Sequence, residues 1–313
     1  MAAVARLGGS GFVAGVAAYL LWGLFPLYWP LLEPAKPVEI LAHRIVWSLL
    51  FAVVLLAVTL GFGWVRGLGR RQARLLALAA VLVSINWGMY IHGVNSGQVV
   101  ETALGYFINP LVTVFLGVVV LRERLRRAQW VAVALGALAV LVLAIDYGHV
   151  PAIALTLAFS FGLYGLIKKR AAVDGIQSFA VESGYLALPA LAYLVVLGAT
   201  GTGTFGTEGA GHAALLACAG VATAVPLMLF GVAAVRVRLT TLGVIQYLAP
   251  VMQFLIGVLI RGEPMPASRL AGFALVWIAL AVFTVDAVRA ARLRARPAVG
   301  PPRPVLAGRS PAS

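Results

Sequence analysis

Residues 107–123 read FINPLVTVFLGVVVLRE, and residues 247–263, at an offset of 140, read YLAPVMQFLIGVLIRGE. Both stretches are apolar runs that carry a proline, a glycine and a glutamate at the same spacing. The matching pairs are Pro110 and Pro250, Gly117 and Gly257, and Glu123 and Glu263. Upstream, Trp22 and Gly23 match Phe161 and Gly162 at an offset of 139. We therefore predict a chain of two related halves. The alternative is that membrane helices simply resemble one another in composition.

The composition is that of a membrane protein. Hydrophobic residues make up 62% of the 313 residues and charged residues 11%, against about 25% in an average soluble domain. Such a chain is not disordered, and one soluble core of this size could not hide so much apolar surface. Ten stretches approach the length of about 20 apolar residues that a membrane-spanning helix needs. We predict an all-α, polytopic protein with spans at 11–31, 38–62, 72–95, 99–121, 128–146, 150–168, 178–200, 212–235, 240–261 and 269–290.

Each predicted half contains five spans. Because five is odd, the second half enters the bilayer with the opposite orientation, and inverted repeats often enclose a site near the midplane. The connections are short, so no large soluble domain remains. The predicted organisation is a short cytoplasmic N-terminus at 1–10, a first repeat at 11–146, a second repeat at 147–290, and a disordered, basic cytoplasmic tail at 291–313.

The charges predict the orientation. The net charge is +14, and 20 of the 24 lysines and arginines fall on one side of the predicted spans, with three on the other and Arg44 inside a span. Basic loops face the cytoplasm. We therefore expect both termini on the cytoplasmic side of the plasma (inner) membrane. Membrane topology and contact with anionic lipid headgroups account for the excess of basic residues, so we expect no nucleic-acid partner. The single cysteine, Cys218, excludes a disulfide framework and a cysteine-based metal cluster, and we expect no cofactor.

Several segments resemble one family. AYLLWGLFPLYW, EILAHRIVWSLLF, NWGMYIHGVN, ETALGYFINPL, AFSFGLYGLIKK and TTLGVIQYLAP are similar to segments of the RarD family, within the EamA-type, two-repeat form of the drug/metabolite transporter superfamily. The resemblance covers about residues 11–290. It implies a ten-helix fold with a central cavity between the halves, and it implies no particular substrate.

An arginine within a span is the first candidate for a substrate ligand. Arg44, preceded by His43, lies about two turns into the second predicted span. A charged group at this depth is costly and usually faces a cavity or a partner. A guanidinium suits carboxylate or phosphate. The alternative is an ion pair with Glu101 that pins two spans together, and a substrate carboxylate could compete for that pair.

Polar and aromatic residues in four other spans complete the predicted cavity lining. Aromatic rings with a polar edge suit an amphipathic organic substrate, although Trp and Tyr also form belts at the membrane interface. Pro110 and Pro250 each remove a helical hydrogen bond, and we predict two symmetry-related helix breaks, whose alternative role is to set curvature only. The predicted cavity-lining set is Trp22, His43, Arg44, Asn86, Trp87, Tyr90, Glu101, Tyr106, Asn109, Gln246, Tyr247 and Gln253.

Other ionisable residues receive structural roles. We expect Glu123 and Glu263 to pair with arginines at the turns that follow their spans, Glu123 with Arg124 or Arg127. Glu182 is expected to reach the lipid headgroups rather than to carry protons. His43 and His92 make proton coupling possible, because histidine titrates near neutral pH. Single histidines are more often hydrogen-bonded packing residues.

These features favour a secondary transporter, expected to export small amphipathic metabolites, amino-acid-like solutes or drugs by alternating access. No phosphate-binding loop is present for an ATP-driven motor, and no nucleophile–base, paired-aspartate or metal-protease pattern points to an enzyme. The alternative functions are a lipid scramblase and a structural membrane protein without transport. The substrate, the direction of flux, the coupling ion and the oligomeric state do not follow from these residues.

Overall fold

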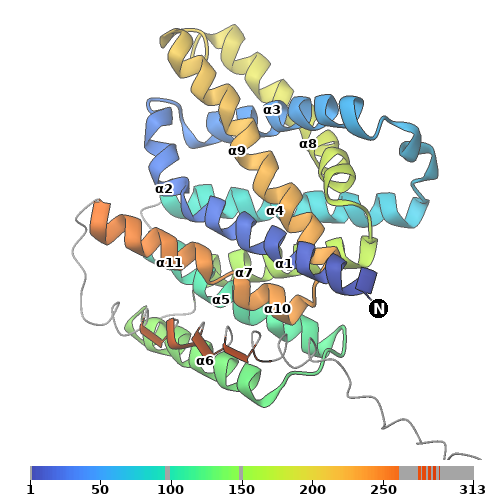
Figure 1. Ribbon diagram of the computed structural model, residues 1–313. Coiled ribbons are helices and arrows are strands. Elements are labelled where there is room, and N and C mark those ends of the chain that lie inside the picture. The colour runs from blue at the N-terminus through green and yellow to red at the C-terminus, as the bar shows by residue number, and fades with distance from the viewer. Residues whose placement is uncertain are drawn as a thin grey trace, which may run out of the picture.

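A computed structural model describes residues 2–95, 99–147 and 151–260, and scattered helical positions between 274 and 289. This part of the chain is all-α (Figure 1). The elements before residue 148 are α1 (Ala2–Gly23), α2 (Phe25–Tyr28), the 3-10 turn η1 (Trp29–Leu32), α3 (Pro37–Thr59), the 3-10 turn η2 (Gly63–Gly67), α4 (Arg70–Asn95), α5 (Val99–Val119) and α6 (Arg127–Tyr147). Those after it are α7 (Ala152–Ala171), α8 (Gly175–Thr200), α9 (Gly209–Arg236), α10 (Leu239–Ile245), α11 (Leu248–Leu255) and the π-helical turn η3 (Ile256–Ile260).

Within the described residues, six helical stretches are long and apolar enough to cross a membrane. They are Ser10–Leu32, Pro37–Thr59, Arg70–Gly93, Ala152–Ala171, Gly175–Thr200 and Gly209–Arg236, and a shorter apolar stretch is Leu104–Val119. The prediction of an all-α, multi-span protein is therefore confirmed at this level. The predicted count of ten goes further than these stretches do, and most of the tenth predicted span, at 269–290, lies outside the described residues, as does the tail.

The outer faces of these helices are apolar. Side chains such as Val58, Leu188 and Val195 are 75%, 77% and 67% exposed on α3 and α8. A soluble helix places polar residues at such positions, because exposed apolar patches promote association. Lipid tails cover them without cost, so this surface fits a bilayer.

Capping residues define the hairpin between α7 and α8. Ala172 adopts a left-handed conformation, with φ of 51°, at the C-cap of α7. The Asp174 carboxylate then accepts a hydrogen bond from the Ile176 amide at 3.0 Å and caps α8. At the other end, α8 terminates at Gly201, whose φ of 64° costs a glycine little. Local sequence therefore sets these helix ends.

The helix breaks lie at different places from those predicted. α5 is helical from Val99 to Val119, straight through Pro110, so the predicted interruption there is wrong. One proline removes a single hydrogen bond, and packed neighbours hold the rest of the helix. In the second half the break falls at Gln246 and Tyr247, between α10 and α11, one turn before Pro250. The Gln246 carbonyl, which Pro250 cannot bond, accepts from the Ala249 amide at 3.3 Å.

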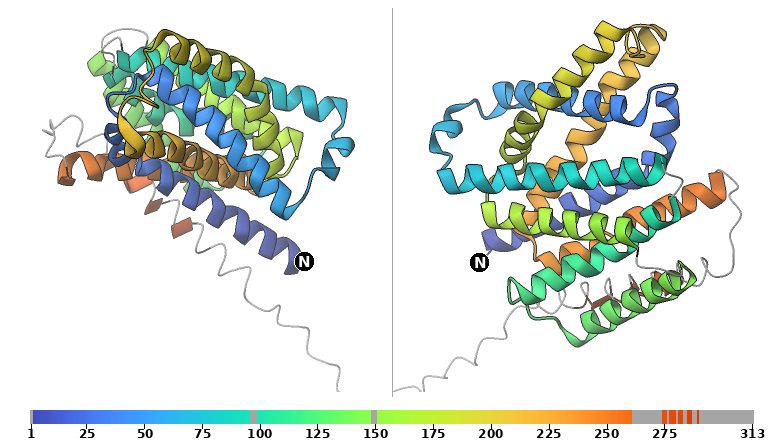
Figure 2. Two further views of the ribbon diagram at one scale, coloured as in Figure 1. Left: turned by 90° about the horizontal axis from the view of Figure 1, so that it is seen from above. Right: turned by 180° about the vertical axis from the view of Figure 1, so that it is seen from behind.

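Helices from the two predicted halves interleave. α1 packs on α9 and α11, α3 on α8 and α9, α4 and α5 on α7, and α5 also on α10 (Figures 1 and 2). A close approach joins α5 and α10: a Cβ added to Gly243 would lie 2.8 Å from the Pro110 carbonyl oxygen. Only a residue without a side chain permits this crossing, so the sequence at Gly243 sets how closely the halves meet.

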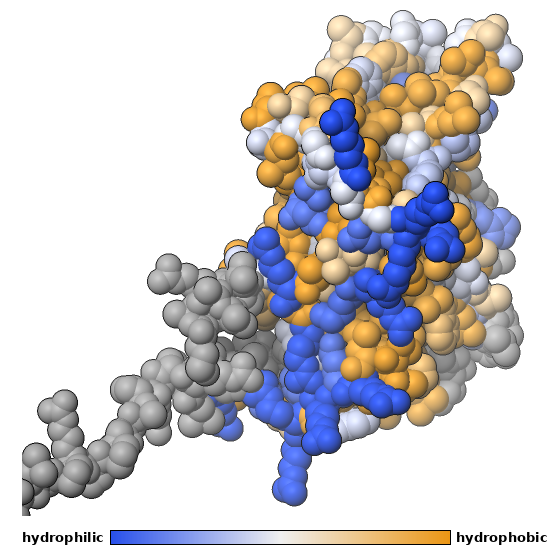
Figure 3. All heavy atoms as spheres, turned by 90° about the vertical axis from the view of Figure 1, so that its right-hand side faces the viewer, coloured by the Kyte–Doolittle hydropathy of each residue, from blue (hydrophilic) through white to orange (hydrophobic). Residues whose placement is uncertain are grey.

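Basic residues gather at one end of the bundle. Strongly hydrophilic side chains spread across this end over an otherwise largely apolar molecule (Figure 3). Contacts tie the helix ends together there: Arg236 donates to the Ser10 hydroxyl at 3.2 Å, and Lys169 donates to the carbonyls of Ala234 and Val237 at the end of α9. The basic loops therefore share one side of the bundle, as a single cytoplasmic face requires.

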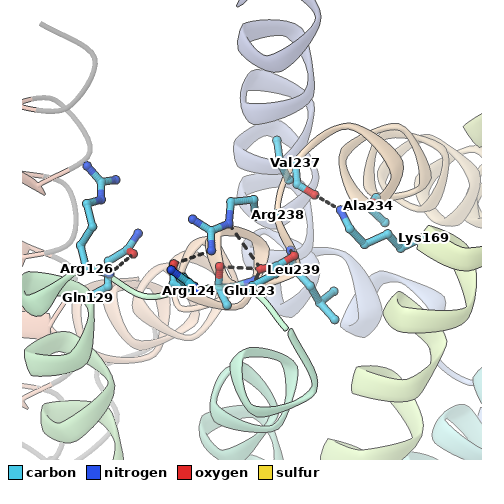
Figure 4. Close-up of polar contacts among 10 residues, drawn as sticks. Glu123, Arg124, Arg126, Gln129, Lys169, Ala234, Val237, Arg238 and Leu239 are labelled. Atoms are coloured by element: carbon cyan, nitrogen blue, oxygen red, sulfur yellow. Dashed lines mark hydrogen bonds and ion pairs between the residues drawn. The ribbon is translucent and has the colours of Figure 1, made fainter. Parts of the chain in front are cut away.

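Glu123 joins the two halves at this basic end (Figure 4). Its two carboxylate oxygens accept from the Leu239 and Thr240 amides, each at 2.9 Å, and from the Thr240 hydroxyl at 2.7 Å. The first-turn amides of α10 have no helical acceptor, and a carboxylate there also meets the positive end of the helix dipole. The ion-pair partner is Arg238, at 3.7 Å, rather than the predicted Arg124 or Arg127. Glu263 lies outside the described residues.

Replacing Glu123 with alanine is expected to lower the free energy of unfolding by about 2 kcal/mol, because two buried helix amides lose their acceptor. Thermal unfolding of the detergent-solubilised protein measures this loss. Arg124→Ala is the matched control. The Arg124 side chain is exposed, and the hydrogen bond from Arg238 goes to the backbone carbonyl of Arg124, which the substitution keeps. Equal melting temperatures for the two variants would show that the Glu123 contacts add no more stability than an exposed side chain does.

Candidate substrate site

A cavity of about 440 Å³ lies between the helices of the two predicted halves. Its lining residues come from α1, α2, η1, α3, α4 and α5 of the first half, and from α7, α9, α11 and the turn between α10 and α11 of the second. Its described lining is Tyr19, Trp22, Phe25, Pro26, Trp29, Pro30, Arg44, Asn86, Trp87, Tyr90, Gly105, Tyr106, Asn109, Leu157, Phe161, Leu227, Gln246, Ala249, Pro250 and Gln253. This volume accommodates a small organic molecule.

The cavity lies toward the end of the bundle that is opposite the basic end. Arg44 is seven residues into α3, about 10 Å along it, and the basic loop follows the far end of that helix. Tyr90 stands near the end of α4, which starts at the same basic loop. The Glu123 contacts with α10 lie at the other, basic end. In this conformation the site is therefore nearer to the non-basic face.

Arg44 is the charged group of the cavity wall. Its guanidinium lies over two indole rings, 4.7 Å from the centre of Trp29 and 5.1 Å from that of Trp87. Its Nε donates to the Thr223 hydroxyl oxygen at 2.8 Å, and that hydroxyl donates to the Ala219 carbonyl, also at 2.8 Å. No described residue accepts a hydrogen bond from the two terminal nitrogens. The arginine is thus held through its Nε and through the two faces of its guanidinium plane. Its two terminal nitrogens are available to bind an anion.

Further aromatic rings line the cavity. Trp22 meets Phe161 edge-on at 5.7 Å between ring centres, and Tyr19 meets Trp22 at 5.0 Å. On the other side, Tyr90 and Tyr106 are 6.2 Å apart. Edge-to-face packing of this kind holds rings in place, and it gives the cavity an apolar wall with polar edges.

Two amide side chains of the wall are bonded to the protein itself. The Asn86 amide donates to the Leu157 carbonyl at 2.9 Å and to the Ser160 hydroxyl at 3.1 Å. The Gln253 amide donates to the Trp22 carbonyl at 3.3 Å. These contacts join α4 to α7 and α11 to α1, so these residues maintain the shape of the cavity whatever it binds.

The sequence relatives decide the family. A model of the EamA-like transporter family matches residues 9–145. The chain is 57% identical over 285 residues to protein RarD of Streptomyces exfoliatus, covering 90% of each chain. It is 41% identical over 281 residues to protein RarD of Escherichia coli, covering 89% of this chain and 95% of that one. The chain belongs to the RarD family of EamA-like transporters.

Two further comparisons agree with this assignment. The uncharacterized transporter YojE of Bacillus subtilis is 42% identical over 285 residues, covering 90% of this chain and 95% of its own. A solved crystal structure aligns over 90% of this chain and 99% of its own with a TM-score of 0.65 and 20% identity, which shows a shared fold. This RarD-family chain is therefore a membrane transporter.

Nine of the twelve residues predicted for the site of this RarD-family transporter line the one cavity. They are Trp22, Arg44, Asn86, Trp87, Tyr90, Tyr106, Asn109, Gln246 and Gln253. The side chain of Glu101 lies outside the described residues, so its predicted pairing with Arg44 stays a prediction.

His43 and Tyr247 are not among the described lining residues. His43 is buried and stacks on Phe205 of the α8–α9 loop, with 4.7 Å between ring centres. Tyr247 is buried against Phe107. Each directly neighbours a cavity residue, Arg44 or Gln246. Successive residues on a helix point about 100° apart, so a neighbour of a cavity residue faces another part of the protein.

The structure adds lining residues from the first span and from α7. Tyr19, Pro26 and Trp29 join the predicted Trp22, and these four residues are spaced three or four apart across the break between α1 and α2. Phe161 contributes from α7. The aromatic spacing was visible in the chain, but the turn that brings Trp29 over Arg44 depends on the break after α1, where Pro26 and Pro30 begin new turns.

A buried ion pair lies beside the cavity of this RarD-family protein. Lys168 on α7 donates to the Glu182 carboxylate on α8 at 2.8 Å and to the Ser178 hydroxyl at 2.6 Å. The Tyr164 hydroxyl donates to the other Glu182 oxygen at 2.9 Å. The two charged side chains are only 1% and 4% exposed. The expectation that Glu182 reaches the headgroups is therefore wrong, and Lys168 is a core residue rather than part of a basic loop.

Proposed function

We propose that this protein is a secondary transporter that exports small amphipathic organic anions by alternating access. The observation that carries the proposal is the Arg44 guanidinium, held between Trp29 and Trp87 in the wall of a cavity that both halves line. The two terminal nitrogens of this guanidinium make no hydrogen bond to a described residue, and such a pair of donors suits a carboxylate. The surrounding rings suit an apolar body.

The same arrangement supports alternating access. The cavity lies toward one end of the bundle, and the Glu123 contacts with Leu239 and Thr240 join the two halves at the other. Breaking these contacts while closing the cavity mouth would move the opening from one membrane face to the other. The positive-inside rule predicts that the basic end is cytoplasmic, and we propose on that basis that both termini are inside and that the cavity in this conformation faces the outside.

Untargeted profiling of the growth medium tests this function. Cells overproduce either the wild-type protein or Arg44→Ala, matched for abundance in the membrane. We expect a set of carboxylate-bearing solutes to accumulate in the medium only with the wild type. The same solutes enriched inside the cells would reverse the direction of transport. Identical profiles in medium and cells would overturn the proposed function.

A further inference from the structure

Two polar side chains in the cavity wall have fully buried polar atoms without a hydrogen-bond partner among the described residues. Gln246 is 3% exposed, and neither its amide nitrogen nor its amide oxygen has a hydrogen-bond partner among the described residues. Tyr19 is 4% exposed, and its hydroxyl also has no hydrogen-bond partner among the described residues. Both residues line the cavity, and the Tyr19 hydroxyl lies close to the Gln246 side chain. The two groups are near enough to act together but do not meet in a hydrogen-bond geometry.

An unpaired buried amide is strongly disfavoured, and native proteins rarely keep one without a reason. Two other amide side chains of this wall show the contrast. Asn86 donates to the Leu157 carbonyl, and Gln253 donates to the Trp22 carbonyl. Gln246 offers both a donor and an acceptor, and Tyr19 adds a hydroxyl that can do either. Together they match a ligand group that itself has a carbonyl and an N–H.

The position of Gln246 fits such a role. It is the first of the two residues between α10, which ends at Ile245, and α11, which begins at Leu248. Its counterpart at the 140-residue repeat offset is Tyr106, which also lines the cavity. The two equivalent positions thus face one site from opposite halves, and the second half supplies the amide.

We propose that Gln246 and Tyr19 form a second polar subsite that binds an amide of the substrate, while Arg44 binds its carboxylate. The substrate class is then an amphipathic N-acyl carboxylate, an organic acid whose apolar body is joined through an amide. Trp22, which packs on Tyr19, and Phe161 contact the apolar body. On binding, the Gln246 side chain turns its amide from the wall to the ligand. This assignment rests on the proposed function, because it takes Arg44 as the anion site.

Three probes separate the two subsites. Hippurate has a phenyl ring, an amide and a carboxylate. 4-Phenylbutyrate has the same ring, chain length and carboxylate, with two methylenes in place of the amide. Hippuramide keeps the amide and lacks the carboxylate charge. Binding of each probe to the purified full-length protein in nanodiscs is measured by quenching of tryptophan fluorescence, since Trp22, Trp29 and Trp87 line the cavity.

The decisive quantity is the ratio of hippurate affinity to 4-phenylbutyrate affinity. Gln246→Leu is expected to lower this ratio about tenfold, because the buried ligand amide loses its partner. Tyr19→Phe is expected to lower it several-fold. Gln72→Leu is the matched comparison: Gln72 lies in the first turn of α4, outside the described cavity lining, and its amide donates to the Ala171 carbonyl at 3.4 Å, so this variant should leave the ratio as in the wild type. Size-exclusion profiles verify that each variant is folded.

The outcomes distinguish this subsite from the anion site. An unchanged ratio in Gln246→Leu, with hippurate still preferred to hippuramide, would overturn the amide subsite and leave the Arg44 proposal standing. Equal affinities for hippurate and hippuramide, with a ratio that falls in Gln246→Leu, would support the subsite and overturn the anion site. No binding of any probe to the folded wild type would overturn the N-acyl carboxylate assignment.

Discussion

Replacing Lys168 with methionine is expected to destabilise the protein by about 3–5 kcal/mol, because it leaves the Glu182 carboxylate buried without its cation. The side chain of Glu182 is only 4% exposed, and its described partners are Lys168 and the Tyr164 hydroxyl. Water cannot replace the ammonium at this depth. Thermal unfolding in detergent should show a melting temperature lower by on the order of 10 °C.

A second substitution tests whether the charge is responsible. Adding Glu182→Gln to Lys168→Met removes the unpaired charge, and the glutamine oxygen still accepts from the Tyr164 hydroxyl. We expect this double variant to regain most of the lost stability, because removing both charges of a buried pair costs far less than removing one. A double variant as unstable as the single one would assign the loss to packing around the Lys168 stem.

The second large effect is on transport. Arg44→Ala is expected to reduce export of the wild-type solute at least about 100-fold, because it removes the only described charged group of the cavity wall. The protein should still fold, since Arg44 uses one hydrogen bond, to Thr223, and two ring contacts. Export is measured as the rate at which preloaded vesicles release that solute, with each variant at equal density.

Two milder variants separate charge from geometry. Arg44→Lys keeps the charge but lacks the planar fork and stacks less well between two indoles, so we expect export to stay well below wild type. Thr223→Val keeps the arginine but removes the acceptor of its Nε, and a several-fold loss should follow. Wild-type export by Arg44→Ala would remove this residue from the substrate site.

Local sequence predicted much of the fold. Uninterrupted apolar stretches such as Pro37–Thr59 and Gly209–Arg236 indicated membrane-spanning helices, because unpaired backbone groups cannot lie in lipid. The Asp174 cap and the basic helix ends likewise depend on residues close in the chain. At Pro110 the local rule failed, since packing against α7 and α10 keeps α5 helical where the sequence alone suggests a break.

Candidate site residues could be chosen by type and depth, which is why Arg44, Trp87 and Tyr106 were identified. Their neighbours could not be sorted in the same way. His43 and Tyr247 have the right chemistry and the wrong direction. Which face of a helix meets the cavity depends on its rotation against other helices, and an almost wholly apolar helix has no polar face to reveal it.

The sequence by itself determined that this chain is a multi-span helical membrane protein of the RarD family with a deep arginine, because hydrophobic length, charge and family motifs are properties of the chain. Only the tertiary structure decided the partners. It placed Arg44 between Trp29 and Trp87, joined Glu182 to Lys168, set Glu123 on the start of α10, and left Gln246 unpaired among the described residues. Most of these contacts join helices that are distant in the chain, and their geometry arises only when the bundle packs.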